Sequence, residues 1–330
     1  MQIYNIMFTF AIIFVSYCSL WQYVRMLKTA FEMNDKTIKP NSVKAWLLAA
    51  RPKTLSGAAV PVMIGTALAY ADRSLYDFKA VPAVLCFLFA FIMQIDANFI
   101  NDCFDFLSGN DDETRLGPKR ACAQGWVSVR KMKVAIVITT VLACLAGFPL
   151  IIYGGAEMIL IGLICVIFCF LYTTHLSYMG MGDLLVLLFF GVVPVCITYY
   201  LQTGTVSTEA LVTALACGLV IDTLLVVNNY RDIDNDRRAG KRTLIVRLGA
   251  AKGRGLYLLL GVAACVMGGF FAFTGHLWAA VLPAVYLVLH VVTFRRMVKI
   301  GSGRGLNAVL GDTARNMFVY GVLVSLGLLL

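Results

Sequence analysis

The sequence predicts an all-α fold, a polytopic bundle of about nine transmembrane helices, and three observations support this prediction. Of the 330 residues, 60% are hydrophobic and only 14% are charged, whereas about a quarter of the residues of a soluble domain are charged. Apolar stretches of about 20 residues recur along the chain, and each can cross a hydrocarbon core of about 30 Å. The basic residues are confined to alternate connections between these stretches, as in polytopic helical proteins.

The apolar stretches predict nine spans in the order 55–72, 80–100, 133–153, 157–175, 183–201, 208–228, 255–274, 277–294 and 314–330. We place the connection 101–132 in the cytoplasm, and every second connection then follows it. This arrangement puts 26 of the 28 lysines and arginines inside and leaves Arg73 and Lys79 outside. Positive residues favour the cytoplasmic side. The net charge of +10 is therefore explained by topology and contact with a lipid bilayer, and no nucleic-acid partner is expected.

The N-terminal segment precedes this arrangement. Residues 3–24 form an extra apolar stretch, and a basic linker, 25–53, leads into the first span. We divide the chain into an extension, 1–43, and a transmembrane domain, 44–330. The extension is either an additional helix or sequence upstream of a start at Met33. No small-residue cleavage site follows it, which argues against a signal peptide.

Two charged connections repeat one pattern. Asn101-x-x-x-Asp105 recurs 127 residues later as Asn228-x-x-x-Asp232, each time at the end of an apolar span. Residues four apart share one face of a helix. The predicted metal ligands are the side-chain oxygens of Asn101, Asp102, Asp105, Asp111, Asn228, Asp232 and Asp236. Oxygen ligands without histidine or thiolate suit a hard cation, Mg²⁺ before Zn²⁺.

Each acidic cluster is followed by cations. Arg115, Lys119 and Arg120 follow the first, and Arg231, Lys241 and Arg242 lie within or after the second. Acidic side chains that hold Mg²⁺, flanked by guanidinium and ammonium groups, suit a bound diphosphate. Positioned metals stabilise a diphosphate leaving group, and a dry bundle protects the resulting allylic cation from water. A single loop of this kind often only fixes topology, but two in register favour a site.

These residues resemble the UbiA superfamily of intramembrane prenyltransferases, whose nine-helix bundles carry N-x-x-x-D and D-x-x-x-D motifs on two cytoplasmic loops. Within it, the chain is most similar to the 1,4-dihydroxy-2-naphthoate prenyltransferases of menaquinone synthesis. Their pattern ND-x-x-D-x-x-x-G-x-D-x-x-x-R-x-GP-x-R is met from Asn101 to Arg120, and NN-x-RD-x-x-x-D-x-x-x-GK-x-T-L-x-VRLG is met from Asn228 to Gly249.

The resemblance implies a Mg²⁺-dependent transfer of a polyprenyl group from polyprenyl diphosphate to 1,4-dihydroxy-2-naphthoate, with decarboxylation. It implies catalytic roles for Asp105, Asp232 and Tyr172, and it adds Arg51, Asn98 and Asp183 to the substrate-binding residues. It also implies a prokaryotic cytoplasmic membrane, with the catalytic loops facing the cytosol.

Two other functions stay open at this point. A sibling enzyme would use another aromatic acceptor, such as 4-hydroxybenzoate. A secondary transporter would place its binding residues near the membrane midplane, whereas the polar residues here gather on one side. Asp96 and Asp222 are acids inside predicted spans, and each either faces the cavity or is hydrogen-bonded to a neighbouring helix.

Overall fold

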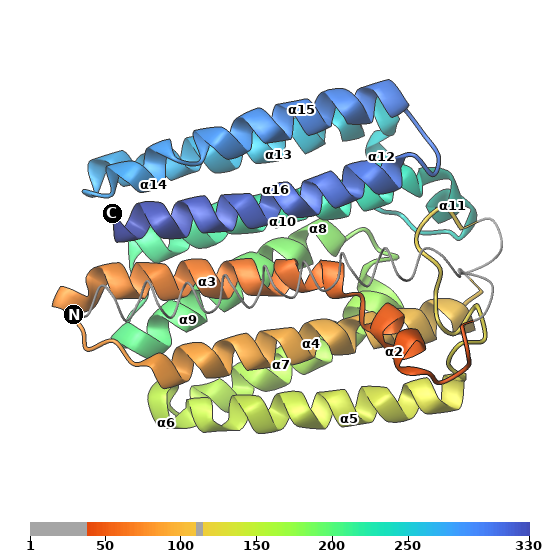
Figure 1. The fold of residues 1–330 in the computed structure, drawn as a ribbon, viewed down its shortest axis with the longest axis horizontal. Coiled ribbons are helices and arrows are strands. Elements are labelled where there is room, and N and C mark those ends of the chain that lie inside the picture. Colours follow the sequence, from red (N-terminus) through yellow and green to blue (C-terminus); the bar gives the residue numbers. More distant parts are fainter. Residues whose placement is uncertain (1–37, 110–114) are drawn as a thin grey trace.

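The computed structural model describes residues 38–109 and 115–330, and this part of the chain is helical and contains no strand (Figure 1). Eight of its helical segments are long and apolar enough to cross a membrane. A further helix, α16 (Leu306–Leu329), has 24 residues and carries more polar side chains. The prediction of a polytopic helical bundle is confirmed. The predicted extension up to residue 37, and Asp111, lie outside the described residues.

The helices follow the predicted spans closely. In chain order they are α2 (Val43–Ala50), α3 (Leu55–Ala71), α4 (Ala80–Leu107), α5 (Val129–Gly147), α6 (Ile151–Gly154), α7 (Glu157–Leu171), α8 (Gly182–Val186), α9 (Val193–Thr203), α10 (Thr208–Arg231), α11 (Ile233–Arg238), α12 (Leu244–Leu248), α13 (Ala250–Gly268), α14 (Leu277–Val281), α15 (Ala284–Ile300) and α16.

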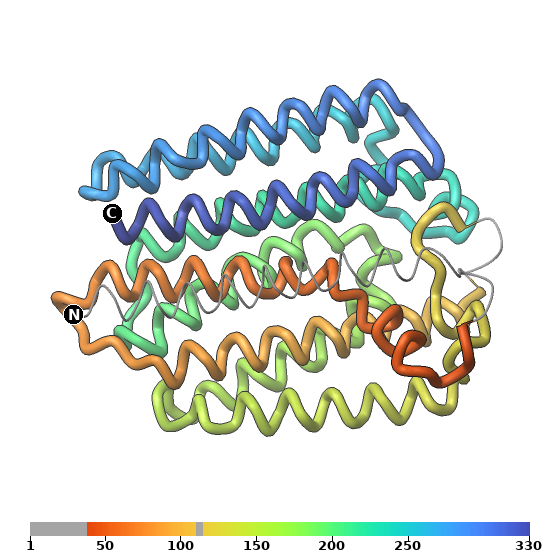
Figure 2. Tube along the Cα trace, in the orientation of Figure 1, coloured from red at the N-terminus to blue at the C-terminus, as the bar shows by residue number. Residues whose placement is uncertain are grey.

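The long helices run side by side along the longest axis of the molecule, and the short helices α2, α11 and α12 gather at one end (Figures 1 and 2). Both α4 and α10 finish at that end. At the centre, α3 packs against α16, α9 and α4, while α10 packs against α13 and α16. Nearly every residue of α3 is buried, whereas Met158 is the one buried residue of α7. The apolar outer face of α7 therefore suits contact with lipid.

Helix α2 is a difference from the prediction, because the sequence reading treated residues 25–53 as a linker. The Ser42 side chain accepts a hydrogen bond from the Ala45 N–H at 3.3 Å and caps the helix. Ala45 and Ala49 are buried in a cluster with Phe99 and Ile100 of α4. Eight residues are too few to show a clear helical period, and this packing stabilises the helix instead.

Two π-helical segments interrupt the bundle, and neither was predicted. Tyr172–Leu176 continues α7, and Leu187–Val192 joins α8 to α9. In the second segment a Cβ on Gly191 would lie 2.6 Å from the Ala214 carbonyl oxygen of α10. Glycine therefore allows a very close approach of the two backbones, as is common between membrane helices. Such π-helical turns are frequent near functional sites.

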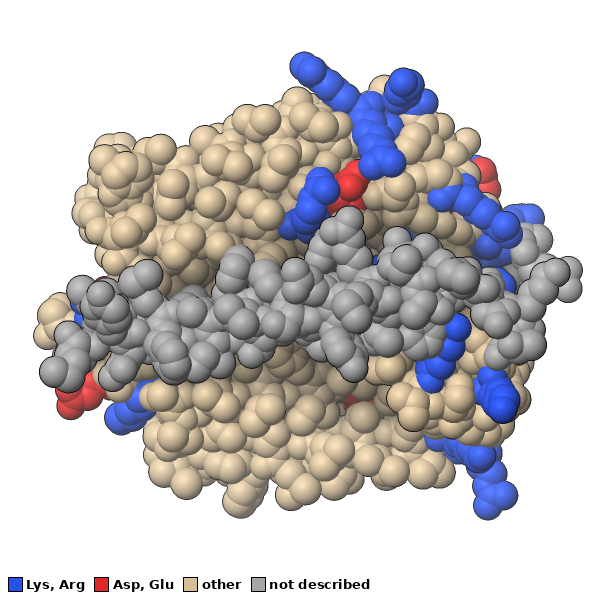
Figure 3. Space-filling view, viewed as in Figure 1, with Lys and Arg blue, Asp and Glu red and all other residues tan. Residues whose placement is uncertain are grey.

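Charge is unevenly distributed along the bundle axis. On the face seen in Figure 3, most lysine and arginine side chains lie toward the end that carries α2, α11 and α12, and few lie at the other end. The two acidic clusters also lie at this basic end, because α4 and α10 finish there.

Candidate active site

A polar cavity of about 240 Å³ lies at the basic end of the bundle, between the carboxyl ends of α4 and α10. Among the predicted site residues, Arg51, Asn101, Asp105, Arg115, Arg120, Tyr172, Asp183, Asn228, Asp232, Asp236 and Lys241 line it. An apolar cavity of about 630 Å³ extends from it into the bundle. Arg51, Asn101, Tyr172 and Asn228 line both cavities, so the two adjoin at these residues.

Asn101 and Asp105 share the cavity face of α4, as their spacing of four residues predicts. The Thr173 hydroxyl donates a hydrogen bond to Asn101 Oδ1 at 2.6 Å. Thr173 belongs to the first π-helical segment, and it was not a predicted site residue. This contact fixes the amide so that its oxygen is oriented by the neighbouring helix.

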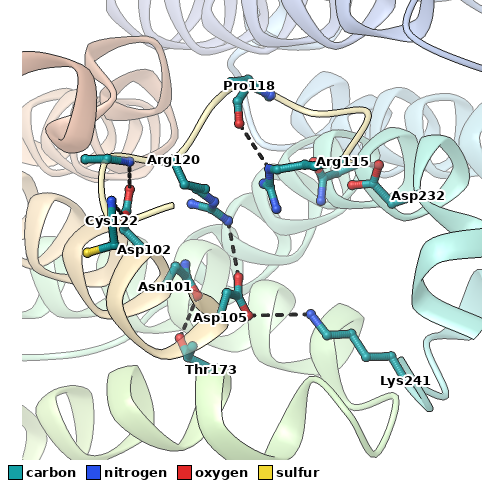
Figure 4. A network of polar contacts seen from close by, with 12 residues as sticks. Asn101, Asp102, Asp105, Arg115, Pro118, Arg120, Cys122, Thr173, Asp232 and Lys241 are labelled. Carbon is teal, nitrogen blue, oxygen red and sulfur yellow. Dashed lines mark hydrogen bonds and ion pairs between the residues drawn. The ribbon is translucent and has the colours of Figure 1, made fainter. Parts of the chain in front are cut away.

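Asp105 lies between two cations that come from different loops. Its carboxylate is 3.3 Å from Arg120 Nη2 and 3.6 Å from Lys241 Nζ. Figure 4 shows Asp105 between these two side chains, with Asp232 farther away beside Arg115. The Lys241 ammonium also lies 4.9 Å from the centre of the Tyr178 ring. One carboxylate therefore joins the two halves of the repeat.

Asp102 does not face the cavity. Its two oxygens accept backbone N–H hydrogen bonds from Ala121 and Cys122, both at 2.8 Å, and the side chain is buried (Figure 4). One residue along a helix turns the side chain by about 100°, so Asp102 cannot share the face of Asn101 and Asp105. The structure thus gives Asp102 the position of an anchor for the following loop, not the ligand position that was predicted.

Arg231 organises the second cluster without lining the cavity. Its guanidinium donates to Asn228 Oδ1 at 2.8 Å, to Asn307 Oδ1 at 2.9 Å and, through Nε, to Asp232 Oδ1 at 2.8 Å. Only 3% of the residue is exposed. Predicted as a substrate ligand, Arg231 instead orients the oxygens of Asn228 and Asp232.

The loop that follows α4 packs against the Arg231 side chain. Asn307, at the start of α16, donates to the Leu116 carbonyl at 2.8 Å. A Cβ on Gly117 would lie 2.7 Å from Arg231 Nη2, so the chain passes directly over the guanidinium. Asn307 was missed by the sequence reading, because nothing local to α16 links it to the acidic motifs.

Three further predicted substrate-binding residues do not line the cavity. Asn98 is buried and donates to the Ala50 carbonyl and to Thr54 Oγ1, both at 2.9 Å. It thereby holds the turn in which Arg51 adopts a left-handed backbone, with φ of 50°. Lys119 and Arg242 are exposed outside the cavity. Most of the predicted site residues line the polar cavity, whereas these three lie outside it.

Asp236, the last acid of the second cluster, lines the polar cavity. Burial raises the pKa of its carboxyl to about 6, Lys241 opposes this rise, and the charges of Asp232 and Asp105 add to it. Its backbone N–H donates to the Asp232 carbonyl at 2.8 Å. Burial therefore favours the neutral form of Asp236 in the metal-free protein, and a cation bound beside it would favour the ionised form.

The donor set of the cavity suits Mg²⁺. Its lining offers carboxylate and amide oxygens and contains no histidine or cysteine, and oxygen ligands are those that hard cations prefer. Within residues 38–109 and 115–330, no three Asp, Glu, His or Cys side chains converge closely enough to hold an ion by themselves. Ions bound here need additional ligands, which phosphate oxygens supply in many Mg²⁺ sites.

The sequence profile of the UbiA prenyltransferase family matches residues 58–321. The chain belongs to this family. The all-helical fold, the two acidic helix ends and the joined cavities are thus features of a UbiA member. Membership decides against the secondary transporter, and the resemblance predicted from the two loop motifs is confirmed.

Several relatives cover most of the chain. The 1,4-dihydroxy-2-naphthoate octaprenyltransferase of Haemophilus influenzae is 33% identical over 90% of this chain and 100% of its own length. The Escherichia coli protein of the same name is 36% identical over 74% of this chain and 83% of its own length. The Mycobacterium tuberculosis protein of that name is 36% identical over 86% and 96%, respectively.

Solved structures share the fold. A UbiA homolog from Aeropyrum pernix superposes with a TM-score of 0.64 at 17% identity and covers 84% of this chain and 98% of its own. A UbiA homolog from Archaeoglobus fulgidus, solved with DMAPP and Mg²⁺ bound, gives a TM-score of 0.59 at 14% identity, over 85% of this chain and 99% of its own.

Proposed function

We propose that this protein transfers a polyprenyl group from polyprenyl diphosphate to 1,4-dihydroxy-2-naphthoate with loss of CO₂, giving a demethylmenaquinol. The observation that carries the proposal is that a polar cavity between the two acidic helix ends adjoins a larger apolar cavity inside the bundle. The names of the relatives in Haemophilus, Escherichia and Mycobacterium support the naphthoate as acceptor over 4-hydroxybenzoate.

The polar cavity suits the diphosphate of the donor. Arg51, Arg115, Arg120 and Lys241 line it and would donate charge-assisted hydrogen bonds to phosphate oxygens. Asn101, Asp105, Asn228, Asp232 and Asp236 would hold Mg²⁺. The ion, when bound, supplies positive charge to the diphosphate as the C–O bond breaks. Thr173 and Arg231 keep the amide and carboxylate oxygens of these residues oriented.

The apolar cavity suits the isoprenoid tail, and its lining from α3, α4, α7 and α9 excludes water from the allylic cation. Tyr172 lies where the cavities join, and its ring face would stabilise that cation by a cation–π interaction. The electron-rich ring of the acceptor then attacks the allylic carbon through the ring carbon that bears the carboxylate.

The direction of the site in the membrane follows from the charges. The basic end carries the polar cavity, and positive residues favour the cytoplasmic side. We therefore place the cavity opening toward the cytosol of a prokaryotic cell, in its cytoplasmic membrane. The diphosphate donor and the anionic naphthoate would then both reach the cavity from the compartment in which charged metabolites are made.

The test is prenyl transfer by purified membranes that contain the protein. Farnesyl or a longer polyprenyl diphosphate is supplied with 1,4-dihydroxy-2-naphthoate or 4-hydroxybenzoate, in Mg²⁺ or in EDTA. We expect prenylated product and CO₂ from the naphthoate in Mg²⁺ alone. If only 4-hydroxybenzoate is prenylated, the enzyme is a prenyltransferase with a different acceptor from the one proposed. If the folded protein prenylates neither acceptor, the proposal is refuted.

A further inference from the structure

Two carboxyl groups, one lining the polar cavity and one buried inside a helix, have no role in the mechanism above. Asp183 is the second residue of α8, and Asp222 lies inside α10. The Oδ1 atom of each is buried and has no hydrogen-bond partner in the described part of the chain, and Asp222 is only 5% exposed. Buried polar atoms are normally paired, so two neighbouring exceptions indicate a binding function.

Helix α8 and the π-helical segment after it pack against α10, and a Cβ on Gly218 of α10 would lie 3.0 Å from the Leu187 carbonyl oxygen. Asp222 and Asp183 each lie four residues from this contact, so they are on facing turns of the two segments. Asp183 lines the polar cavity. Asp222 precedes Asn229 by seven residues, so the two share a face of α10 and lie about 10 Å apart along it. Leu225, on the same face, lines the cavity together with Asn229. Asp183 and Asp222 are also close enough for their charges to interact.

The Tyr172 hydroxyl lies at the same place. A Cβ on Gly182, the residue before Asp183, would lie 3.8 Å from Tyr172 Oη and 3.4 Å from Leu225 Cδ2. Tyr172 lines both cavities. The Tyr172 hydroxyl and the Asp183 carboxyl group therefore lie near the point at which the reacting ends of donor and acceptor would meet, with Asp222 behind Asp183.

We propose that Asp183 and Asp222 form a carboxyl pair that shares one proton and binds a hydroxyl group of the aromatic acceptor. Asp183 contacts the hydroxyl, and Asp222 is a positioning residue that acts through Asp183. Two adjacent carboxylates in a dry site repel each other, so a single proton between them is the favoured state. This inference rests on the proposed function, because it names the residues that bind the acceptor of that reaction.

The pair also accounts for the proton balance of the transfer. As the ring carbon bonds to the allylic carbon, Asp183 takes the proton of the bound hydroxyl, and that oxygen becomes a ketone. The bond from the same ring carbon to the carboxylate then breaks, CO₂ leaves, and its electron pair restores the aromatic ring. The oxygen regains the proton from Asp183. The products are prenylated diol, CO₂ and diphosphate, and no proton is gained or lost overall.

Asp96 provides a matched comparison. It is a fully buried acid within α4, but Thr139 and Thr140 of α5 both donate to its carboxylate, the latter at 2.8 Å. Like Asp222, it lines neither cavity. Asp96 thus has the hydrogen-bonded arrangement between neighbouring helices, whereas Asp222 has an oxygen without a partner.

The experiment measures the KM of the acceptor and the KM of the donor for Asp183→Asn, Asp222→Asn, the double variant and Asp96→Asn. We expect each single variant of the pair to raise the acceptor KM about tenfold or more and to leave the donor KM unchanged. The double variant should be no worse than Asp183→Asn, because the two residues act as one unit. Asp96→Asn should change neither KM.

Unchanged acceptor KM values, or equal rises in the donor and acceptor KM, would refute the role of the two acids in acceptor binding. These results would not contradict the proposed function, which depends on the activity of the wild-type protein. A wild-type protein without transfer activity would instead refute the proposed function. If Asp183→Asn does not fold, Asp222→Asn decides the matter, because it leaves Asp183 itself unchanged and removes only its positioning partner.

Discussion

Lys241 Nζ lies 3.6 Å from the Asp105 carboxylate, and this ion pair joins the connection between α11 and α12 to the carboxyl end of α4. The two residues are 136 positions apart in the sequence. Both line the polar cavity. Because Lys241 also faces the Tyr178 ring, the ammonium is held at the cavity edge, where a diphosphate would compete with Asp105 for it.

Replacing Lys241 should weaken donor binding. We expect Lys241→Ala to raise the KM of the polyprenyl diphosphate by about 10- to 100-fold, because a hydrogen bond to a charged group contributes about 1.5–3 kcal/mol. The KM of the naphthoate should change much less. Arg237→Ala is the control, since Arg237 is exposed and pairs with the exposed Asp234. A defect confined to the naphthoate would contradict this role for Lys241.

Removing a metal-binding carboxylate should abolish turnover without unfolding the bundle. Asp105→Ala and Asp232→Ala should each lower kcat by about 100- to 1,000-fold, the range typical of a lost electrostatic contact to a developing charge. Thermal unfolding in detergent checks that the helices remain packed. Near-normal activity in either well-expressed variant would show that the replaced residue is not a ligand of the metal.

Gly117 should tolerate no side chain. In Gly117→Ala the new Cβ would lie 2.7 Å from Arg231 Nη2, and this guanidinium cannot yield easily because Asn228, Asp232 and Asn307 hold it. We expect the affinity for Mg²⁺ and diphosphate to fall at least tenfold. Gly255→Ala, in α13 where a Cβ meets nothing within 4 Å, should bind normally. Equal binding by the two variants would argue against Arg231 as the organiser of the site.

The sequence predicted the parts of this site that depend on local spacing. Asn101 and Asp105 share a helical face because they are four residues apart. The same rule places Asp102, one residue after Asn101, on a different face of α4. The contacts of Arg231 with Asn307 and of Thr173 with Asn101 join residues 76 and 72 positions apart. No local pattern specifies such pairs, because they arise from how α16 and the first π-helical segment pack.

The same limit applies to the short elements. The nine predicted spans came from hydrophobic length alone, and eight of them match helices apolar enough to cross a membrane in the described part of the chain. Helix α2 and the π-helical turns were not, since tertiary contacts such as Ala49 on α4 and Gly191 on α10 stabilise them. Asn98 and Asp183, by contrast, came only from the resemblance, and the structure separates them into a support for the Arg51 turn and a residue of the cavity.

The titration of Asp236 predicts how the requirement for Mg²⁺ depends on pH. Burial raises the pKa of this carboxyl to about 6 in the metal-free protein, so Asp236 is mainly neutral at pH 5 and mainly ionised at pH 7. A cation binds the ionised form and displaces the proton. The Mg²⁺ concentration for half-maximal activity should therefore rise about tenfold as the pH falls from 7 to 5.

The measurement is a Mg²⁺ titration of prenyl transfer at several pH values between 5 and 7.5, with saturating donor. Asp236→Asn is the matched variant, because its amide oxygen occupies the same place but does not ionise. It should bind Mg²⁺ more weakly at pH 7 and should lose most of the pH dependence. If wild type and variant respond to pH alike, the dependence belongs to another group, such as the donor diphosphate, and Asp236 does not titrate with metal binding.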